Sequence, residues 1–162
     1  MTLDELLARE AIRDTIAKYN VSGDRLKVDD YAACFTEDGI IQSEEAPGQF
    51  IFRYEGREEI RAWQNRWLSR EPGQDTVHKA SFVRHHLGTC KIDLTGPDTA
   101  KVRTYWAAWT DIGPDHCGVY IDDFRKVEGE WLIALRRVRK DWVSPDGLFQ
   151  SAIDNTGLTP GG

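Results

Sequence analysis

Apolar residues in the first third of the chain recur at three- and four-residue steps. Ile12, Ile16 and Tyr19 follow this spacing, which is that of one face of an α-helix. Residues 2–5 read Thr-Leu-Asp-Glu and form a capping box, in which the threonine and the glutamate satisfy each other's free backbone N–H groups. The pattern predicts a first helix that runs to about Asn20.

Two more helices are expected before the pattern changes. A short one is predicted over residues 28–35, after Ser22, Gly23 and Asp24 break the helical spacing. Asp24 is thereby placed in the connection between two helices. A third helix starts near Gly56 and stops near Pro72, because apolar residues again recur at helical steps between them.

The second half of the chain alternates with a period of two, which is typical of strands. The predicted strands cover residues 39–43, 50–54, 79–94, 101–111, 117–127 and 131–143. Turn compositions at residues 96–98, 113–115 and 128–130 favour antiparallel hairpins. We expect an α+β fold, a cone-shaped α+β barrel with three N-terminal helices packed on a strongly curved antiparallel sheet. This domain spans residues 1–143, and residues 144–162 form a partly ordered tail.

Composition narrows the function classes. The chain has 162 residues and a formal net charge of −6, and no basic cluster is interleaved with aromatic residues, which argues against nucleic acid as a partner. The first ten residues hold no apolar run, so a secretory signal or a membrane span is not expected, and a cytoplasmic location follows by default. Three cysteines without a Cys-x-x-Cys pair argue against a disulfide framework and a structural zinc site.

This order of elements resembles the nuclear transport factor two-like superfamily and, within it, the SnoaL-like family. Five segments carry the resemblance, namely residues 10–14 (EAIRD), 33–39 (ACFTEDG), 54–60 (YEGREEI), 86–89 (HLGT) and 129–133 (GEWLI). The scaffold hosts dehydratases, dehydrohalogenases, polyketide cyclases, isomerases, epoxide hydrolases and non-catalytic subunits. Activity therefore has to be argued from the site.

In SnoaL-like lyases, such as scytalone dehydratase, bile acid 7-alpha-dehydratase and hexachlorocyclohexane dehydrochlorinase, an aspartate after the first helix orients a histidine on a long strand. Asp24 and His86 match these positions by the resemblance. A carboxylate on one ring nitrogen of an imidazole fixes its tautomer and makes the other nitrogen more basic, so such a pair can remove a proton from carbon. The alternative is that Asp24 caps a helix or turn and His86 is a hydrogen-bonded core histidine.

Strand alternation separates the two adjacent histidines. His86 shares a face with Cys90, Ile92 and Leu94, whereas His85 falls on the polar side, so His86 is expected to face the interior. Consecutive strand residues point to opposite faces, so the two histidines do not chelate one ion, and no metal is expected.

The resemblance also implies helper residues. Tyr19, five residues before Asp24, matches a phenol of bile acid dehydratase, although core packing explains it equally well. Tyr54 matches a tyrosine with which scytalone dehydratase contacts its substrate. Arg136 matches the arginine that assists the leaving group in the dehydrochlorinase, while Arg137 and Arg139 alternate to the opposite face of the strand. An aromatic set is expected to line an apolar pocket, and several of its members to be core: Trp63, Trp67, Trp106, Trp109, Phe82 and Tyr120.

The sequence thus predicts a cofactor-independent lyase that acts on a small hydrophobic cyclic or polycyclic substrate through an Asp24–His86 pair, with dehydration favoured over dehydrohalogenation. A polyketide cyclase or ketosteroid-type isomerase starts with the same proton abstraction and stays open. A non-catalytic subunit, like the β subunit of ring-hydroxylating dioxygenases, or a ligand-binding module is the rival outside enzymes. An exposed sheet face with excess aromatic residues favours a homodimer or homotrimer.

Overall fold

A computed structural model describes residues 1–46, 49–68 and 80–147. The elements follow one another as α1 (Leu3–Asp24), α2 (Val28–Ala32), β1 (Phe35–Ala46), β2 (Gln49–Glu55), α3 (Arg57–Leu68), β3 (Arg84–Leu94), β4 (Thr99–Thr110), β5 (Gly113–Val127) and β6 (Glu130–Val143). The predicted tail, 144–162, lies outside the described residues from 148 onward. None of the helices in the described ranges combines the length and the apolar character that a membrane crossing requires.

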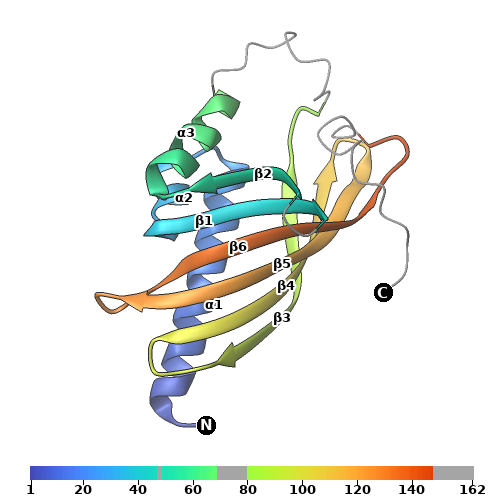
Figure 1. The fold of residues 1–162 in the computed structure, drawn as a ribbon. Coiled ribbons are helices and arrows are strands. Elements are labelled where there is room, and N and C mark those ends of the chain that lie inside the picture. Colours follow the sequence, from blue (N-terminus) through green and yellow to red (C-terminus); the bar gives the residue numbers. More distant parts are fainter. Residues whose placement is uncertain (47–48, 69–79, 148–162) are drawn as a thin grey trace.

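The strands form one curved six-stranded sheet in the order β2-β1-β6-β5-β4-β3 (Figure 1). Neighbouring strands are antiparallel except β1 and β6, which run parallel. The predicted α+β class and the N-terminal helices on a curved sheet are confirmed. The sheet is not closed into a barrel, because β2 and β3 remain as separate edges.

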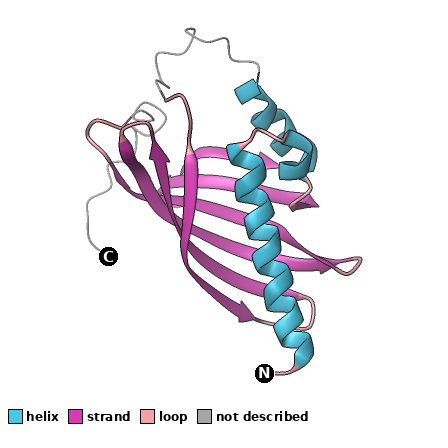
Figure 2. Ribbon diagram, turned by 180° about the vertical axis from the view of Figure 1, so that it is seen from behind, coloured by secondary structure: helices cyan, strands magenta, loops and turns pink. Residues whose placement is uncertain are grey.

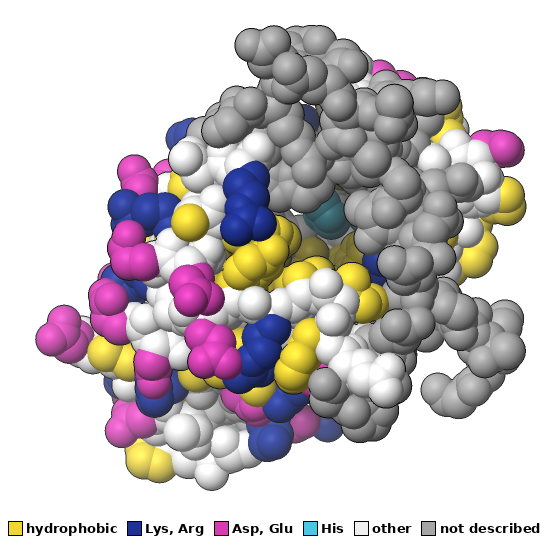
Figure 3. Space-filling view, turned by 45° about the horizontal axis from the view of Figure 1, so that its top comes forward, with side chains coloured by type: hydrophobic (Ala, Val, Ile, Leu, Met, Phe, Trp, Pro, Cys, Tyr) yellow, Lys and Arg dark blue, Asp and Glu magenta, His cyan; other side chains and the backbone are white. Residues whose placement is uncertain are grey.

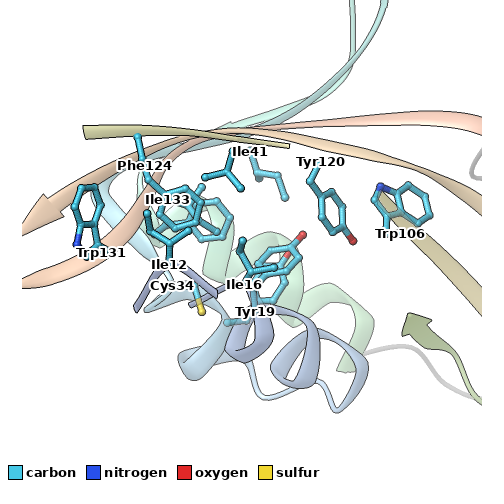
Figure 4. Packing of buried hydrophobic residues seen from close by; sticks show 14 of the residues in the cluster. Ile12, Ile16, Tyr19, Cys34, Ile41, Trp106, Tyr120, Phe124, Trp131 and Ile133 are labelled. Atoms are coloured by element: carbon cyan, nitrogen blue, oxygen red, sulfur yellow. The ribbon is translucent and has the colours of Figure 1, made fainter. Parts of the chain in front are cut away.

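Helix α1 lies on one face of the sheet and runs across its strands (Figure 2). The apolar stripe of α1, including Ile12 and Ile16, meets the inner residues of the strands and forms the core (Figure 4). Strand β4 alternates between buried and exposed positions from Thr99 to Trp106, as a half-buried strand should. The side chains that determine function therefore lie on the inner face, under or beside α1.

Several element boundaries differ from the sequence prediction. Helix α2 ends at Ala32 and not at residue 35, and β3 begins at Arg84 and not at residue 79. Helix α1 continues to Asp24 because Ser22 is buried and Gly23 packs against the ring of Tyr31, so tertiary contacts outweigh their low helix propensity. Strand β5 begins at Gly113, whereas residues 113–115 were expected to form the turn. Strand β1 extends from Phe35 to Ala46, whereas the prediction covered only residues 39–43.

Candidate active site

The last residue of α1 contacts the first part of β3. The carboxylate of Asp24 accepts a hydrogen bond from the Nδ1 side of His85, with 2.6 Å between Oδ1 and Nδ1. Its other oxygen accepts the backbone N–H of His85 at 3.0 Å. The Asp24 side chain is 4% exposed and that of His85 26% exposed. Two bonds to one residue fix the position of the imidazole and leave Nε2 as the ring nitrogen that Asp24 does not occupy.

The carboxylate of Asp24 lies where the helix macrodipole disfavours it, at the C-terminus of α1. Arg84 Nη1 lies 3.8 Å from its Oδ2, and the arginine side chain is half in solvent. A buried carboxylate at this end is stable only when donors surround it, and His85 with Arg84 supply them. The pair is therefore positioned by long-range packing between α1 and β3 rather than by local sequence.

A β-bulge in β3 corrects the predicted choice of histidine. Leu87 pairs with Trp106 and Cys90 with Thr104, so Gly88 and Thr89 together stand opposite a single residue of β4. The extra residue reverses the alternation.

Upstream of the bulge, the inner face is taken by His85, which pairs with the fully buried Ala108. His86 is exposed on the outer face, where its ring lies 5.9 Å from that of Trp109. The expectation that His86 faces the interior and pairs with Asp24 is wrong.

A second His–Asp pair lies beside the first one, on β5. Nδ1 of His116 is 2.8 Å from Oδ1 of Asp115, and Asp115 is completely buried. The ring of His116 lies 6.2 Å from that of His85, edge to face. Sequence reasoning missed this pair because Asp115 was assigned to a turn. The signal that was available is an acid next to a histidine directly after Gly-Pro.

Aromatic rings connect the two histidines. The ring of Trp106 lies 5.9 Å from that of His85 and 5.4 Å from that of His116, and it stacks on Tyr120 at 5.5 Å. Figure 3 shows a histidine inside a hollow that is bordered by apolar side chains. The predicted pocket residues Trp106 and Tyr120 thus lie at the site, and both are nearly fully buried.

Alternation put Arg136 on the face opposite Arg137 and Arg139 and left open which face is inner. In the structure Arg136 lies on the inner face, and its guanidinium is engaged within the protein. Nε and Nη2 bind the two oxygens of Asp122 at 2.8 and 2.6 Å. The guanidinium carbon also lies 4.0 Å from the ring centre of Tyr19 and 4.2 Å from that of Tyr120. Both charged side chains are completely buried. Burial acts to lower the pKa of Arg136, but the carboxylate of Asp122 more than offsets it, so the net shift is upward.

The three tyrosines around Arg136 remain protonated. Tyr31 donates a hydrogen bond to the hydroxyl of Tyr19 at 2.7 Å. Burial raises the pKa of Tyr19 above its ordinary value, and it raises the pKa of Tyr31 and Tyr120 well above theirs. Phenols in this state are hydrogen-bond donors rather than bases. Tyr19 is therefore a packed core residue that also carries a polar hydroxyl.

The remaining predicted pocket residues lie elsewhere. Tyr54 and Trp63 stack on each other at 5.3 Å between β2 and α3, and the ring of Trp63 lies 6.3 Å from that of Tyr31 at the edge of the core. Phe82 is 47% exposed before the start of β3. In the described part of the chain, no group of three or more His, Cys, Asp or Glu side chains is placed to hold a metal ion.

The protonation of His116 makes stability depend on pH. Burial lowers the pKa of His116, and the neighbouring His85 lowers it further, whereas the bond to Asp115 opposes both. Between the folded pKa and the unfolded value of about 6.5, the unfolded chain binds more protons, so this stabilisation is present above about pH 6.5 and is lost as the pH falls. We expect the free energy of unfolding, measured with urea, to fall less between pH 7 and pH 5 in His116→Gln than in the wild type. Equal losses in the two proteins would contradict this assignment.

The geometry offers two imidazoles, each oriented by a buried carboxylate, on the wall of an aromatic hollow. In each pair the carboxylate contacts Nδ1, which favours the tautomer whose Nε2 accepts protons. Such groups can take a proton from carbon and return it to a departing or rearranged atom.

Comparisons with known proteins agree with this architecture. The sequence-family model of the SnoaL-like domain matches residues 4–137 of this chain. Among solved structures, a proposed scytalone dehydratase from Novosphingobium aromaticivorans is 24% identical, with 89% of this chain and 91% of that one covered and a TM-score of 0.70. The hexachlorocyclohexane dehydrochlorinase LinA-type3 from Novosphingobium barchaimii is 17% identical, with 88% and 92% covered and a TM-score of 0.70.

A third similar structure is the β subunit of a proposed aromatic-ring-hydroxylating dioxygenase from Novosphingobium aromaticivorans. It is 17% identical, with 90% of this chain and 96% of that one covered and a TM-score of 0.71. The sequence has no significant match among curated proteins. The structural matches show the shared fold, and the family match covers most of the chain. The chain therefore belongs to the family of SnoaL-like domains.

Proposed function

We propose that this protein is a cofactor-independent lyase that removes a proton from a cyclic, largely apolar substrate and expels a hydroxyl or halide. The observation that carries the proposal is the double contact between Asp24 and His85, in which one buried carboxylate binds both the ring and the backbone of the histidine. This arrangement fixes Nε2 of His85 as the base. General bases of this kind contribute about 10²–10⁴-fold to a rate.

The surroundings of His85 favour elimination. The aromatic rings of Trp106 and Tyr120 provide the flat apolar wall that a cyclic substrate requires. Burial lowers the pKa of His116, so a second imidazole in its neutral form lies 6.2 Å from the ring of His85. Similarity to a proposed scytalone dehydratase and to a hexachlorocyclohexane dehydrochlorinase agrees with this reaction class.

The test of the pair is the isosteric change Asp24→Asn. An asparagine presents an N–H₂ group where the carboxylate accepted the Nδ1 hydrogen, so it favours the wrong tautomer of His85, and in serine proteases the equivalent change costs about 10⁴-fold. We expect kcat to fall by about 10³-fold or more on hydroxylated and halogenated ring compounds, measured by product analysis. Asp29→Asn is the matched control, because Asp29 is 82% exposed and binds only Arg61 among the ion pairs of the described residues.

Product analysis in D₂O separates the related reactions. A lyase releases water or halide and leaves a new double bond, whereas an isomerase returns the proton and a cyclase forms a carbon–carbon bond. If no compound of the panel is turned over and Asp24→Asn loses only stability, the proposal fails and a binding or subunit role replaces it.

A further inference from the structure

Gly118 lies on the inner face of β5, between the two side chains that stand opposite it on the neighbouring strands. It pairs with Trp106 of β4 on one side and with Lys140 of β6 on the other. Along β5, residues 116 and 120 occupy the next positions on the same face, because alternation separates them by two. Gly118, which has no side chain, is thus surrounded by four side chains on this face: Trp106, His116, Tyr120 and Lys140.

The glycine at this position is required by the approach of β6. A Cβ atom on Gly118 would collide with the carbonyl oxygen of Arg139, so no other residue fits without moving the strand. The close approach coincides with a bulge in β6, where the partners jump from Lys140 to Trp142 between Gly118 and Cys117. Before this bulge the strand alternates regularly, so Lys140 shares the inner face with Arg136 and Val138.

Lys140 and Arg136, which share the inner face of β6, have opposite pKa shifts. Burial lowers the pKa of Lys140 to about 8, whereas the carboxylate of Asp122 outweighs burial at Arg136 and raises its pKa. Lys140 stands opposite Gly118, and His116 lies two residues from Gly118 along β5, so both side chains project from the same face of the sheet. A lysine ammonium has three N–H donors and can serve more than one acceptor.

Trp106, on the other side of Gly118 from Lys140, carries a second hydrogen-bond donor. Its side chain is 4% exposed, and within the described residues its indole Nε1–H has no hydrogen-bond partner. An unpaired buried donor is destabilising, and an acceptor on a bound substrate would remove that cost. The ring that carries it contacts both His85 and His116.

We propose that Trp106 Nε1–H and the Lys140 ammonium bind a substrate oxygen that becomes negatively charged when His85 removes a proton. The substrate class is then a ring compound with a carbonyl group next to the carbon that loses the proton. This inference rests on the proposed function, since it takes His85 as the base. It adds the substrate carbonyl group, which makes the neighbouring C–H bond acidic. The two His–Asp pairs alone do not identify this group.

The step balances without any further reagent. His85 Nε2 takes the proton, the C–H electron pair forms a carbon–carbon double bond, and the carbonyl oxygen becomes an enolate held by the two donors. The enolate then re-forms the carbonyl and expels the hydroxyl on the next carbon, which leaves as water with the proton from His85. Donors placed where negative charge develops act in this way in many enzymes.

The probe for the donor pair is 4-nitrophenol, whose phenolate resembles an enolate and whose ionisation is read from its absorbance. We expect the wild type to bind the phenolate in preference to the neutral phenol. Lys140→Met should weaken phenolate binding by about tenfold, since hydrogen bonds to charged groups are the stronger class. Trp106→Phe keeps an aromatic ring, although a smaller one, and removes the N–H, and it should weaken phenolate binding severalfold.

Lys101→Met is the matched control, because Lys101 lies on the outer face of β4 and is 73% exposed. A second measurement needs no variant: phenolate binding to the wild type should weaken as the pH rises through about 8, where Lys140 loses its proton. Near-ultraviolet circular dichroism verifies that each variant is folded, and if Lys140→Met is not, Trp106→Phe and the pH series decide.

The proposal is overturned if 4-nitrophenol does not bind, if the wild type shows no preference for the phenolate, or if folded Lys140→Met and Trp106→Phe bind it like the wild type. Binding of the probe involves no proton transfer from carbon, so it is measured equally well in His85→Gln. The outcome is therefore independent of whether His85 acts as the base.

Discussion

His85→Gln is expected to lower kcat by about 10²–10⁴-fold, while His86→Gln leaves kcat unchanged within about a factor of two. The first change removes the imidazole that Asp24 orients, and with it the Nε2 that acts as the base. The loss of a general base lowers a rate by about 10²–10⁴-fold. The second change affects an exposed side chain on the outer face, where substitutions have little effect. Turnover of the ring-compound panel by the two purified variants measures the difference.

The two variants are a matched pair, because they change the same residue type at adjacent positions of one strand. Equal losses in both would mean that β3 does not keep its bulge in solution. A loss only in His86→Gln would overturn the assignment of His85 as the base. Thermal unfolding of both variants separates a catalytic loss from a folding defect.

Asp122→Ala is expected to lower the free energy of unfolding by about 3–5 kcal/mol, because it leaves the guanidinium of Arg136 buried and without its carboxylate. Urea denaturation measures the change. In the reverse sense, the double change Asp122→Leu with Arg136→Met removes both charges, and it should recover most of the lost stability, since well-packed apolar residues replace buried ion pairs at little cost.

The control is Asp123→Ala, one residue along the strand. Asp123 faces outward and is paired with Arg137 at 3.4 Å, with both side chains more than one third exposed. Exposed pairs contribute about 0–1 kcal/mol, so this variant should be nearly as stable as the wild type. A large loss in Asp123→Ala, or a small one in Asp122→Ala, would show that the ion pair is not the source of the effect.

The fold was predictable from the sequence because its signals are local. Helical spacing in α1 and α3 and alternation in β4 each arise from one buried face per element, and short turns leave little choice in how consecutive strands pair. The boundaries that failed were those decided by distant contacts. Gly23 continues the helix only because the ring of Tyr31 packs against it, and no local pattern records that contact.

The candidate site was predictable in part. Alternation along β6 correctly separated Arg136 from Arg137 and Arg139, since no bulge lies between these positions. The same argument failed for His86, because alternation is not defined across a bulge. The isolated Gly88 inside the strand was the available signal for that bulge. The binding of Arg136 by Asp122 connects two strands through their register, which single-strand patterns do not contain.

The bulge has a consequence for how mutations act on this strand. Losing Gly88 or Thr89 would leave one residue opposite Tyr105 and restore plain alternation, because the residues on either side of the bulge already pair one to one with β4. Leu87 would stay opposite Trp106 and His85 opposite Ala108, so the imidazole of His85 would still face the end of α1. The site should thus tolerate the loss of one residue at the bulge.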